Sequence, residues 1–119
     1  MLVALRFTVV EGDEATFRRR AETAMTALSA RPGFRRGGLS RAIDDVGAWL
    51  LLTEWDSVGS WRRALSSYDV KMSAVPLLSQ AVDEPSAYET LVVDDGGGAG
   101  LHVIASDRAA DADTTGPLR

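Results

Sequence analysis

The alternation of apolar and polar side chains in the first third of the chain predicts a strand followed by a helix. From 2 to 10, apolar residues occupy every second position, as in a strand with one covered face. From 17 to 28 they recur every three to four positions, which is typical of an amphipathic helix. Residues 31–33, Arg-Pro-Gly, should end this helix, because proline cannot continue it and glycine turns the chain.

The middle of the chain predicts a hairpin of two strands, 34–43 and 48–55, joined by a turn at 44–47. The glycine pair at 37–38 suggests a bulge or a close backbone approach. Residues 48–55 are apolar on both faces of the strand. A strand of this kind should be covered on both sides.

A second helical region should follow the hairpin, capped by Asp56 or Ser57, interrupted at 66–69 and broken again near Pro76. Residues 84–92 are predicted as a last strand, with Tyr88 and Leu91 as packed residues. Arg6 and Glu54 are expected on neighbouring strands, where they would form an ion pair.

The resulting β-α-β-β-α-β order predicts an α+β, ferredoxin-like antiparallel sheet with both helices on one face. The other face would then expose apolar side chains, either Trp49, Leu51 and Trp55 or Leu50 and Leu52. A patch of that size is rare on a monomer. We therefore expect a homodimer that buries the two bare sheet faces against each other.

The composition of the 119 residues, 45% apolar and 25% charged, is that of a globular protein. It also limits the kinds of catalytic and metal site that the chain can form. The chain has no cysteine and one histidine, His102, so no disulfide, thiolate nucleophile or metal site is expected.

The net charge of -4 argues against a nucleic-acid partner. No apolar run is long enough for a membrane span. The N-terminus reads as a strand rather than a signal peptide, which favours the cytoplasm of a bacterium-like cell.

Most of the negative charge lies at the C-terminal end. Residues 1–91 carry eleven basic and twelve acidic side chains, whereas 92–119 carry two and five. The latter stretch is also rich in glycine and aspartate and poor in apolar residues, which disfavours a packed core. We predict a folded domain at 1–91 and a tail at 92–119, in which 101–105 is β-prone and could pair with a sheet edge.

Within residues 2–91 the chain carries, in order, Arg-Phe-Thr-Val at 6–9, Phe17, Arg-Pro-Gly-Phe at 31–34, Thr-Glu-Trp-Asp-Ser at 53–57 and Trp-Arg-Arg-Ala-Leu at 61–65. Together these segments resemble the antibiotic biosynthesis monooxygenase (ABM) family. The resemblance is greatest to the anthrone oxygenases of actinobacterial polyketide pathways. It implies a dimeric α/β barrel of ferredoxin-like protomers. It also implies oxidation of a phenolic aromatic substrate to a quinone by O2, with no metal, flavin or other cofactor.

The resemblance also assigns roles to residues. Trp55 matches a tryptophan of the anthrone oxygenases and is the candidate catalytic residue. Leu51 and Leu5 stand where those enzymes have asparagines, which hold the substrate oxygen and stabilise negative charge. Candidate substrate-binding residues are Leu5, Phe7, Trp49, Leu51, Thr53, Tyr68 and Met72. Thr53, Arg6, Arg41, Tyr68 and Tyr88 are the polar groups that could replace the asparagines.

Three functions remain open at this point. The haem-degrading branch of the family is disfavoured, because Leu5 and Ala64 replace two of its residues and no histidine precedes His102. The chain is expected to be a cofactor-independent monooxygenase acting on an aromatic molecule in a hydrophobic cavity. The leucines favour a non-catalytic dimer that binds a small hydrophobic ligand. A structural dimer, with Trp49 and Trp55 serving only in packing, is the third.

Overall fold

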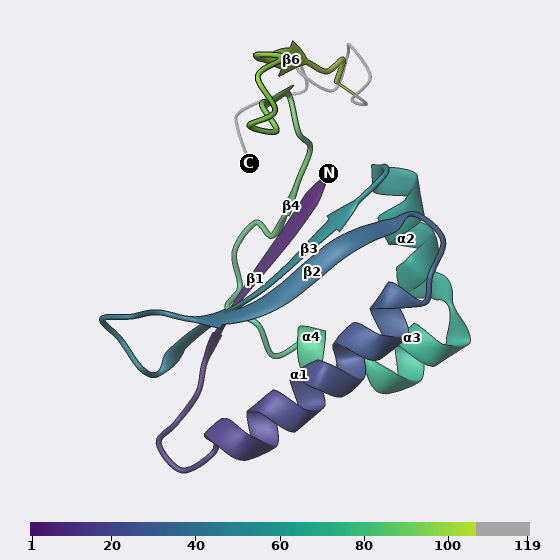
Figure 1. The fold of residues 1–119 in the computed structure, drawn as a ribbon. Helices are drawn as coiled ribbons and strands as arrows, with labels where there is room; N and C mark the ends of the chain where they lie inside the picture. Colours follow the sequence, from purple (N-terminus) through teal and green to yellow (C-terminus); the bar gives the residue numbers. More distant parts are fainter. Residues whose placement is uncertain (107–119) are drawn as a thin grey trace, which may run out of the picture. The chain divides into compact units, whose positions relative to one another are not determined.

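The computed structural model describes residues 1–106, which fall into two compact units. The first unit comprises Met1–Tyr88, and the second begins at Glu89. In the first unit, helices lie against one face of a twisted sheet (Figure 1). The division into a domain of 1–91 and a tail of 92–119 stays a prediction, and 107–119 lie outside the described residues.

Four strands form the sheet, in the order β2-β3-β1-β4, and every neighbouring pair is antiparallel. Their bounds are Leu2–Thr8 for β1, Phe34–Arg41 for β2, Ala48–Trp55 for β3 and Ala87–Tyr88 for β4. This order is ferredoxin-like and confirms the predicted fold class. Because β2 and β4 are edge strands, the sheet of one chain does not close into a barrel.

The pairing of β1 with β3 decides which side chains face the helices. Leu5 lies opposite Leu51, and Arg6 lies opposite Leu50. Successive side chains point to opposite faces of a sheet, so the pairs alternate between the helix side and the open side. The helix side holds the buried residues Val3, Phe7, Trp49, Leu51, Thr53 and Trp55.

Helix α1, Glu14–Ser29, buries the predicted stripe on this side of the sheet: Phe17, Ala21, Ala24 and Leu28. Asp13 stands at its N-cap position, but the side chain makes no capping hydrogen bond. The helix approaches β2 closely at Gly37, where a Cβ would collide with Sδ of Met25. The bulge in β2 lies between Phe34 and Arg36 rather than at the glycine pair.

The second helical region is three short helices, with the break at 66–69 where it was predicted. They are α2 Val58–Ser66, α3 Tyr68–Ser73 and α4 Val75–Leu78. Ser57 caps α2 by accepting a hydrogen bond from the Ser60 amide, and Ser67 caps α3 in the same way at Val70. No helix within residues 1–106 has the length and apolar character to cross a membrane.

The face of the sheet away from the helices carries a band of half-buried apolar side chains. Leu50 and Leu52 of β3 lie there beside Leu2 and Ala4 of β1. The structure thus selects one of the two sets left open by the sequence: the leucines lie on the open face, and the tryptophans lie inside.

The last strand is shorter than predicted. Only Ala87–Tyr88 pairs regularly with β1, although Ala4 donates to the Ser86 carbonyl and Val82 donates to the Arg6 carbonyl further along. Proline lacks an amide proton, so Pro85 interrupts the ladder. The expected packing of Tyr88 was also wrong, since its side chain is half-exposed.

The second unit contains a two-stranded antiparallel sheet, β5 Val92–Val93 with β6 His102–Val103. Within the β-prone patch at 101–105, His102–Val103 forms the strand β6, and its partner is β5. Leu91, predicted to pack in the core, lies in this unit and is half-exposed.

The turn between α1 and β2 depends on Gly33, which has φ +88° and lies against Ser60 of α2. A Cβ at this position would overlap the Ser60 side chain. Gly12 has a similar φ of +98°, but open space surrounds it. A side chain at Gly12 would therefore meet backbone strain alone, whereas a side chain at Gly33 would meet both backbone strain and a steric clash.

We expect Gly12→Ala to cost about 1–3 kcal/mol of unfolding free energy, the cost of a left-handed alanine. Gly33→Ala should cost a further ~1–3 kcal/mol, because the methyl group also overpacks against Ser60. Urea unfolding of both variants measures the difference. Equal losses would show that α2 does not press on this turn.

Candidate functional site

The candidate catalytic residue, Trp55, lies in a sealed layer between the sheet and the helices. Its side chain is 0% exposed. The indole packs edge-on against Phe34, with ring centroids 5.2 Å apart, and at a tilt against Trp61 of α2, with ring centroids 5.5 Å apart. Its Nε1 donates a hydrogen bond of 2.9 Å to Oγ1 of Thr53, two residues earlier on the same face of β3. The ring is thereby fixed in position and orientation.

The two leucines at which the resemblance to anthrone oxygenases implies asparagines lie opposite each other. Leu5 of β1 is the register partner of Leu51 of β3. Leu51 is 0% exposed and Leu5 is half-buried. The structure thus brings Trp55, Thr53, Leu51 and Leu5 to the same face of the two central strands.

The polar chemistry of this layer is sparse. Among residues 1–106, the buried polar side chains are Thr53 and Ser60. Neither ionises near neutral pH, and the Thr53 oxygen already accepts the indole proton of Trp55. The layer is therefore apolar, and within the described residues it contains no buried carboxylate, imidazole or amine that could act as a base.

Two further candidates, Phe7 and Trp49, lie on the same face nearer the opposite end of β3. Phe17 of α1 joins them, 5.1 Å from Phe7 and 5.5 Å from Trp49 between ring centroids. The guanidinium of Arg41, on β2, lies over the Trp49 ring at 5.4 Å. Trp49 is 8% exposed, and within the described part of the chain its Nε1 is the buried side-chain polar atom without a hydrogen-bond partner.

The remaining candidates, Tyr68 and Met72, lie on the outer side of α3. Their exposed fractions are 74% and 61%. The structure does not bring them into the layer with Trp55. A one-turn spacing on a helix predicts that two residues share a face, but it does not say which way that face points.

The surface hollows among the described residues include the following three, and Trp55, Leu51 and Thr53 line none of these. One, of about 330 Å³, is lined by Arg18, Glu22, Leu39, Arg41 and Trp49. A second, of about 380 Å³, lies on the open face and is lined by Leu2, Arg36, Gly37, Gly38, Ser40, Leu52 and Glu54. The third, of about 450 Å³, is lined by Val9, Glu11, Glu14, Arg41, Val46 and Gly47.

The first of these hollows involves residues that sequence reasoning passed over. From the sequence, Arg18 and Glu22 look like residues on the solvent-exposed face of a helix. The sequence pattern does not show that β2 places Leu39 beside them. Within residues 1–106, no group of three or more histidine, cysteine, aspartate or glutamate side chains could hold a metal ion.

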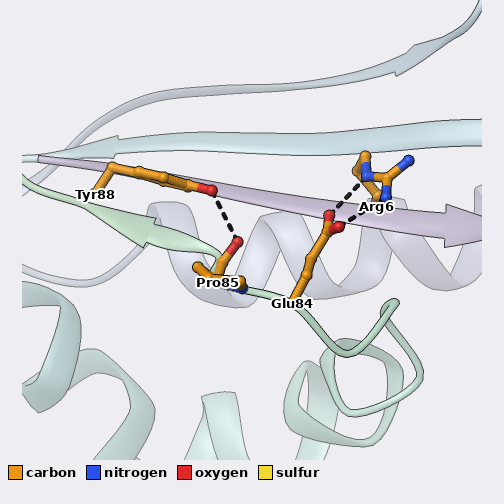
Figure 2. Close-up of polar contacts among 4 residues, drawn as sticks. All are labelled: Arg6, Glu84, Pro85 and Tyr88. Atoms are coloured by element: carbon orange, nitrogen blue, oxygen red, sulfur yellow. Dashed lines mark hydrogen bonds and ion pairs between the residues drawn. The ribbon is translucent and has the colours of Figure 1, made fainter. Parts of the chain in front are cut away.

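Arg6, one of the polar candidates, is engaged on the open face in a two-pronged ion pair (Figure 2). Its Nε and Nη2 donate to the two carboxylate oxygens of Glu84 at 2.6 and 2.7 Å. Nearby, the Tyr88 hydroxyl donates to the Pro85 carbonyl at 2.9 Å. The hydrogen bonds from Arg6 lower the pKa of Glu84 below its usual value.

The expected ion pair between Arg6 and Glu54 was therefore wrong. The antiparallel register sets Arg6 opposite Leu50, so Glu54 lies at the other end of β1. Glu54 pairs instead with Arg36 of β2, at 3.5 Å.

The family model described as Antibiotic biosynthesis monooxygenase matches residues 1–73. Among solved structures, SnoaB, described as a cofactor-independent oxygenase from Streptomyces nogalater, is 27% identical, with a TM-score of 0.60 over 76% of this chain and 94% of SnoaB.

Two more distant structures support the fold alone. A conserved protein from Methanosarcina mazei Go1 is 20% identical, with a TM-score of 0.60, and the match covers 72% of this chain and 84% of that one. Rv0793 from Mycobacterium tuberculosis is 17% identical, with a TM-score of 0.57 over 92% and 96% of the two chains. No curated protein matches.

The Arg6–Glu84 pair predicts a particular dependence of stability on pH. A carboxylate whose pKa is lower in the folded state stabilises the fold above its unfolded pKa, and this contribution disappears as pH falls through the folded pKa. We expect Glu84→Gln to be less stable than the natural chain at pH 6. The gap should shrink steadily as pH falls below 4.5, the usual value for this group.

Urea unfolding at pH 6 and at pH 3 measures this gap. Glu22→Gln is the matched control, because Glu22 makes a single, longer contact of 3.4 Å to Arg18. A gap for Glu84→Gln that stays constant with pH would contradict a role for the ionised pair in holding residues 82–88 against β1.

Proposed function

The chain belongs to the antibiotic biosynthesis monooxygenase family, and on this premise we propose that it oxidises an aromatic small molecule with O2, without metal or flavin, beside Trp55. The observation that carries the proposal is the buried Trp55 indole, held by Thr53 and flanked by Phe34 and Trp61. Aromatic walls of this kind favour a planar aromatic ligand. The likeness to SnoaB, an oxygenase described as cofactor-independent, supports the same reaction class.

The reaction would draw its electrons from the substrate itself. A phenol or enol that has lost its proton can pass an electron to O2. Combination of the two radicals and loss of water then converts one CH2 group into C=O. Both atoms of O2 are accounted for, one in the product and one in water.

The apolar layer sets the conditions for that chemistry. It excludes water, which protects the oxygen-bearing intermediate from side reactions. Burial also disfavours an anion. Since no buried base is described, the substrate would have to arrive already deprotonated or lose its proton to water on the way in.

Because the Trp55 side chain is 0% exposed, a ligand could reach it only if the elements packed over it moved. The helices α2 to α4 are four to nine residues long, whereas α1 has sixteen, and Trp61 of α2 lies directly against the Trp55 ring. Helices this short derive little stability from their own hydrogen bonds and depend on packing. We propose that α2 and α3 move aside to admit the ligand.

A second function rests on a specific observation. Leu5 and Leu51 face each other where the anthrone oxygenases have asparagines, so no amide is present to hold a substrate oxygen. A layer of this kind suits binding without activation. The chain would then be a non-catalytic carrier of a small hydrophobic or aromatic molecule.

Incubation with an anthrone under air tests the two functions. For an oxygenase we expect quinone formation above the protein-free rate with no added metal or cofactor. Trp55→Phe should lower the rate by about tenfold, equivalent to ~1.4 kcal/mol of transition-state stabilisation. Tyr88→Phe is the control, because Tyr88 is a half-exposed aromatic residue outside the layer.

Turnover equal to the protein-free rate would reject the oxygenase. If the tryptophan fluorescence nevertheless shifts on addition of the anthrone, and Trp55→Phe abolishes that shift, the binding function stands. The thermal unfolding midpoints of both variants establish that the comparison is made on folded protein.

We further propose that two copies pair through their open sheet faces. The half-buried band on that face includes Leu50 and Leu52, and the hollow beside it offers space for partner side chains. Covering these residues would remove apolar surface from water on both copies at once.

Leu52→Glu tests this pairing. The side chain is partly exposed in one chain, so glutamate is tolerated in a monomer, but a dimer would bury two like charges near each other. We expect the natural chain to sediment as a dimer at micromolar concentration and Leu52→Glu as a monomer. Ile43→Glu, at the fully exposed hairpin tip, should remain a dimer. A natural chain that sediments as a monomer rejects the proposal.

A further inference from the structure

The hollow between α1 and the β2–β3 hairpin has features of a binding site separate from the Trp55 layer. It has a volume of about 330 Å³ and is lined by Arg18, Glu22, Leu39, Arg41 and Trp49. Trp49 precedes Trp55 by six positions on β3, which separates the two tryptophans by about 20 Å along the strand. A ligand in this hollow would therefore not touch Trp55.

The lining of the hollow combines an aromatic surface with a cation. Trp49 is held from one side by Phe17, at 5.5 Å between ring centroids. From β2, Arg41 lies over the same indole at 5.4 Å. A guanidinium stacked on a ring keeps its N–H groups free in its own plane, where they can bind both oxygens of a carboxylate.

The charges around the hollow leave an excess of positive charge. Arg18 and Arg41 face one carboxylate, Glu22. Glu22 already pairs with Arg18 at 3.4 Å, an exposed contact of small energy. Arg41 has no ion pair within residues 1–106, so its charge is the one available to an anionic ligand.

One residue that lines the hollow also carries an unsatisfied donor. The Nε1 of Trp49 is buried and lacks an acceptor, whereas the equivalent atom of Trp55 donates to Thr53. Buried polar groups are almost always hydrogen-bonded, so an orphan of this kind needs an explanation. A small shift of the indole on ligand binding would let a ligand oxygen accept this proton.

We infer that this hollow binds a small planar aromatic carboxylate of one or two rings. The ring would lie on Leu39 and Trp49, and the carboxylate would accept hydrogen bonds from Arg41. The volume is at the lower end of the range for small-molecule sites, which limits the ligand to this size. This site does not depend on the oxygenase proposal, because it shares none of the residues around Trp55.

Titration with 2-naphthoate tests the inference directly. Calorimetry should show saturable binding to the natural chain. Arg41→Gln should weaken it by about tenfold or more, the effect of losing a charge-assisted pair. The control is Arg35→Gln on the same strand, since Arg35 is exposed and does not line the hollow. It should leave the affinity unchanged, and methyl 2-naphthoate, which lacks the anion, should bind the natural chain as weakly as naphthoate binds Arg41→Gln.

NMR of the indole N–H groups locates the ligand. On titration, the resonance of Trp49, identified by its absence in Trp49→Phe, should shift, while those of Trp55 and Trp61 should stay in place. Absence of saturable binding, equal weakening by Arg41→Gln and Arg35→Gln, or a shift confined to Trp55 would each overturn the inference. Oxidation of the anthrone is a separate assay, so either proposal can fail while the other stands.

Discussion

The register between β1 and β3 is the constraint on which the rest of the structure depends. Leu5 pairs with Leu51, and Arg6 pairs with Leu50. A slip of one residue would turn every side chain of one strand to the opposite face. In the observed register, Trp49, Leu51, Thr53 and Trp55 face the helices together, while Leu50 and Leu52 remain on the open side.

The same register gives the two ends of β3 different chemistry. At the Trp55 end, Phe34 and Trp61 flank the Trp55 indole, and Thr53 accepts the hydrogen bond from its N–H group. This end of the layer is therefore apolar and closed. At the Trp49 end, the hairpin edge brings Arg41 over the indole and leaves its donor without an acceptor. One end suits the family's chemistry on an apolar aromatic molecule, and the other suits an aromatic molecule that carries a charge.

The sequence predicts the fold well wherever a periodic pattern is long. The alternation at 2–10 and the stripe at 17–28 predict β1 and α1 from their spacing alone. The pattern could not say which face of β3 the helices cover, since both faces are apolar. It also missed the pairing of Arg6 with Glu84, because the partner lies 78 positions away in an irregular segment that Pro85 keeps from forming a full strand. The Arg41–Trp49 stack escaped notice for a related reason, since it depends on the hairpin register.

Hydrogen exchange of the indole protons tests the register most directly. The Trp55 proton is buried and bonded to Thr53, whereas Trp61 is half-buried near the surface. If β1 and β3 pair as described, the Trp55 indole proton should exchange only when α2 and α3 move aside or the domain unfolds, and that of Trp61 should exchange much faster. Exchange of Trp55 as fast as that of Trp61 would place the tryptophan face outside and contradict the account.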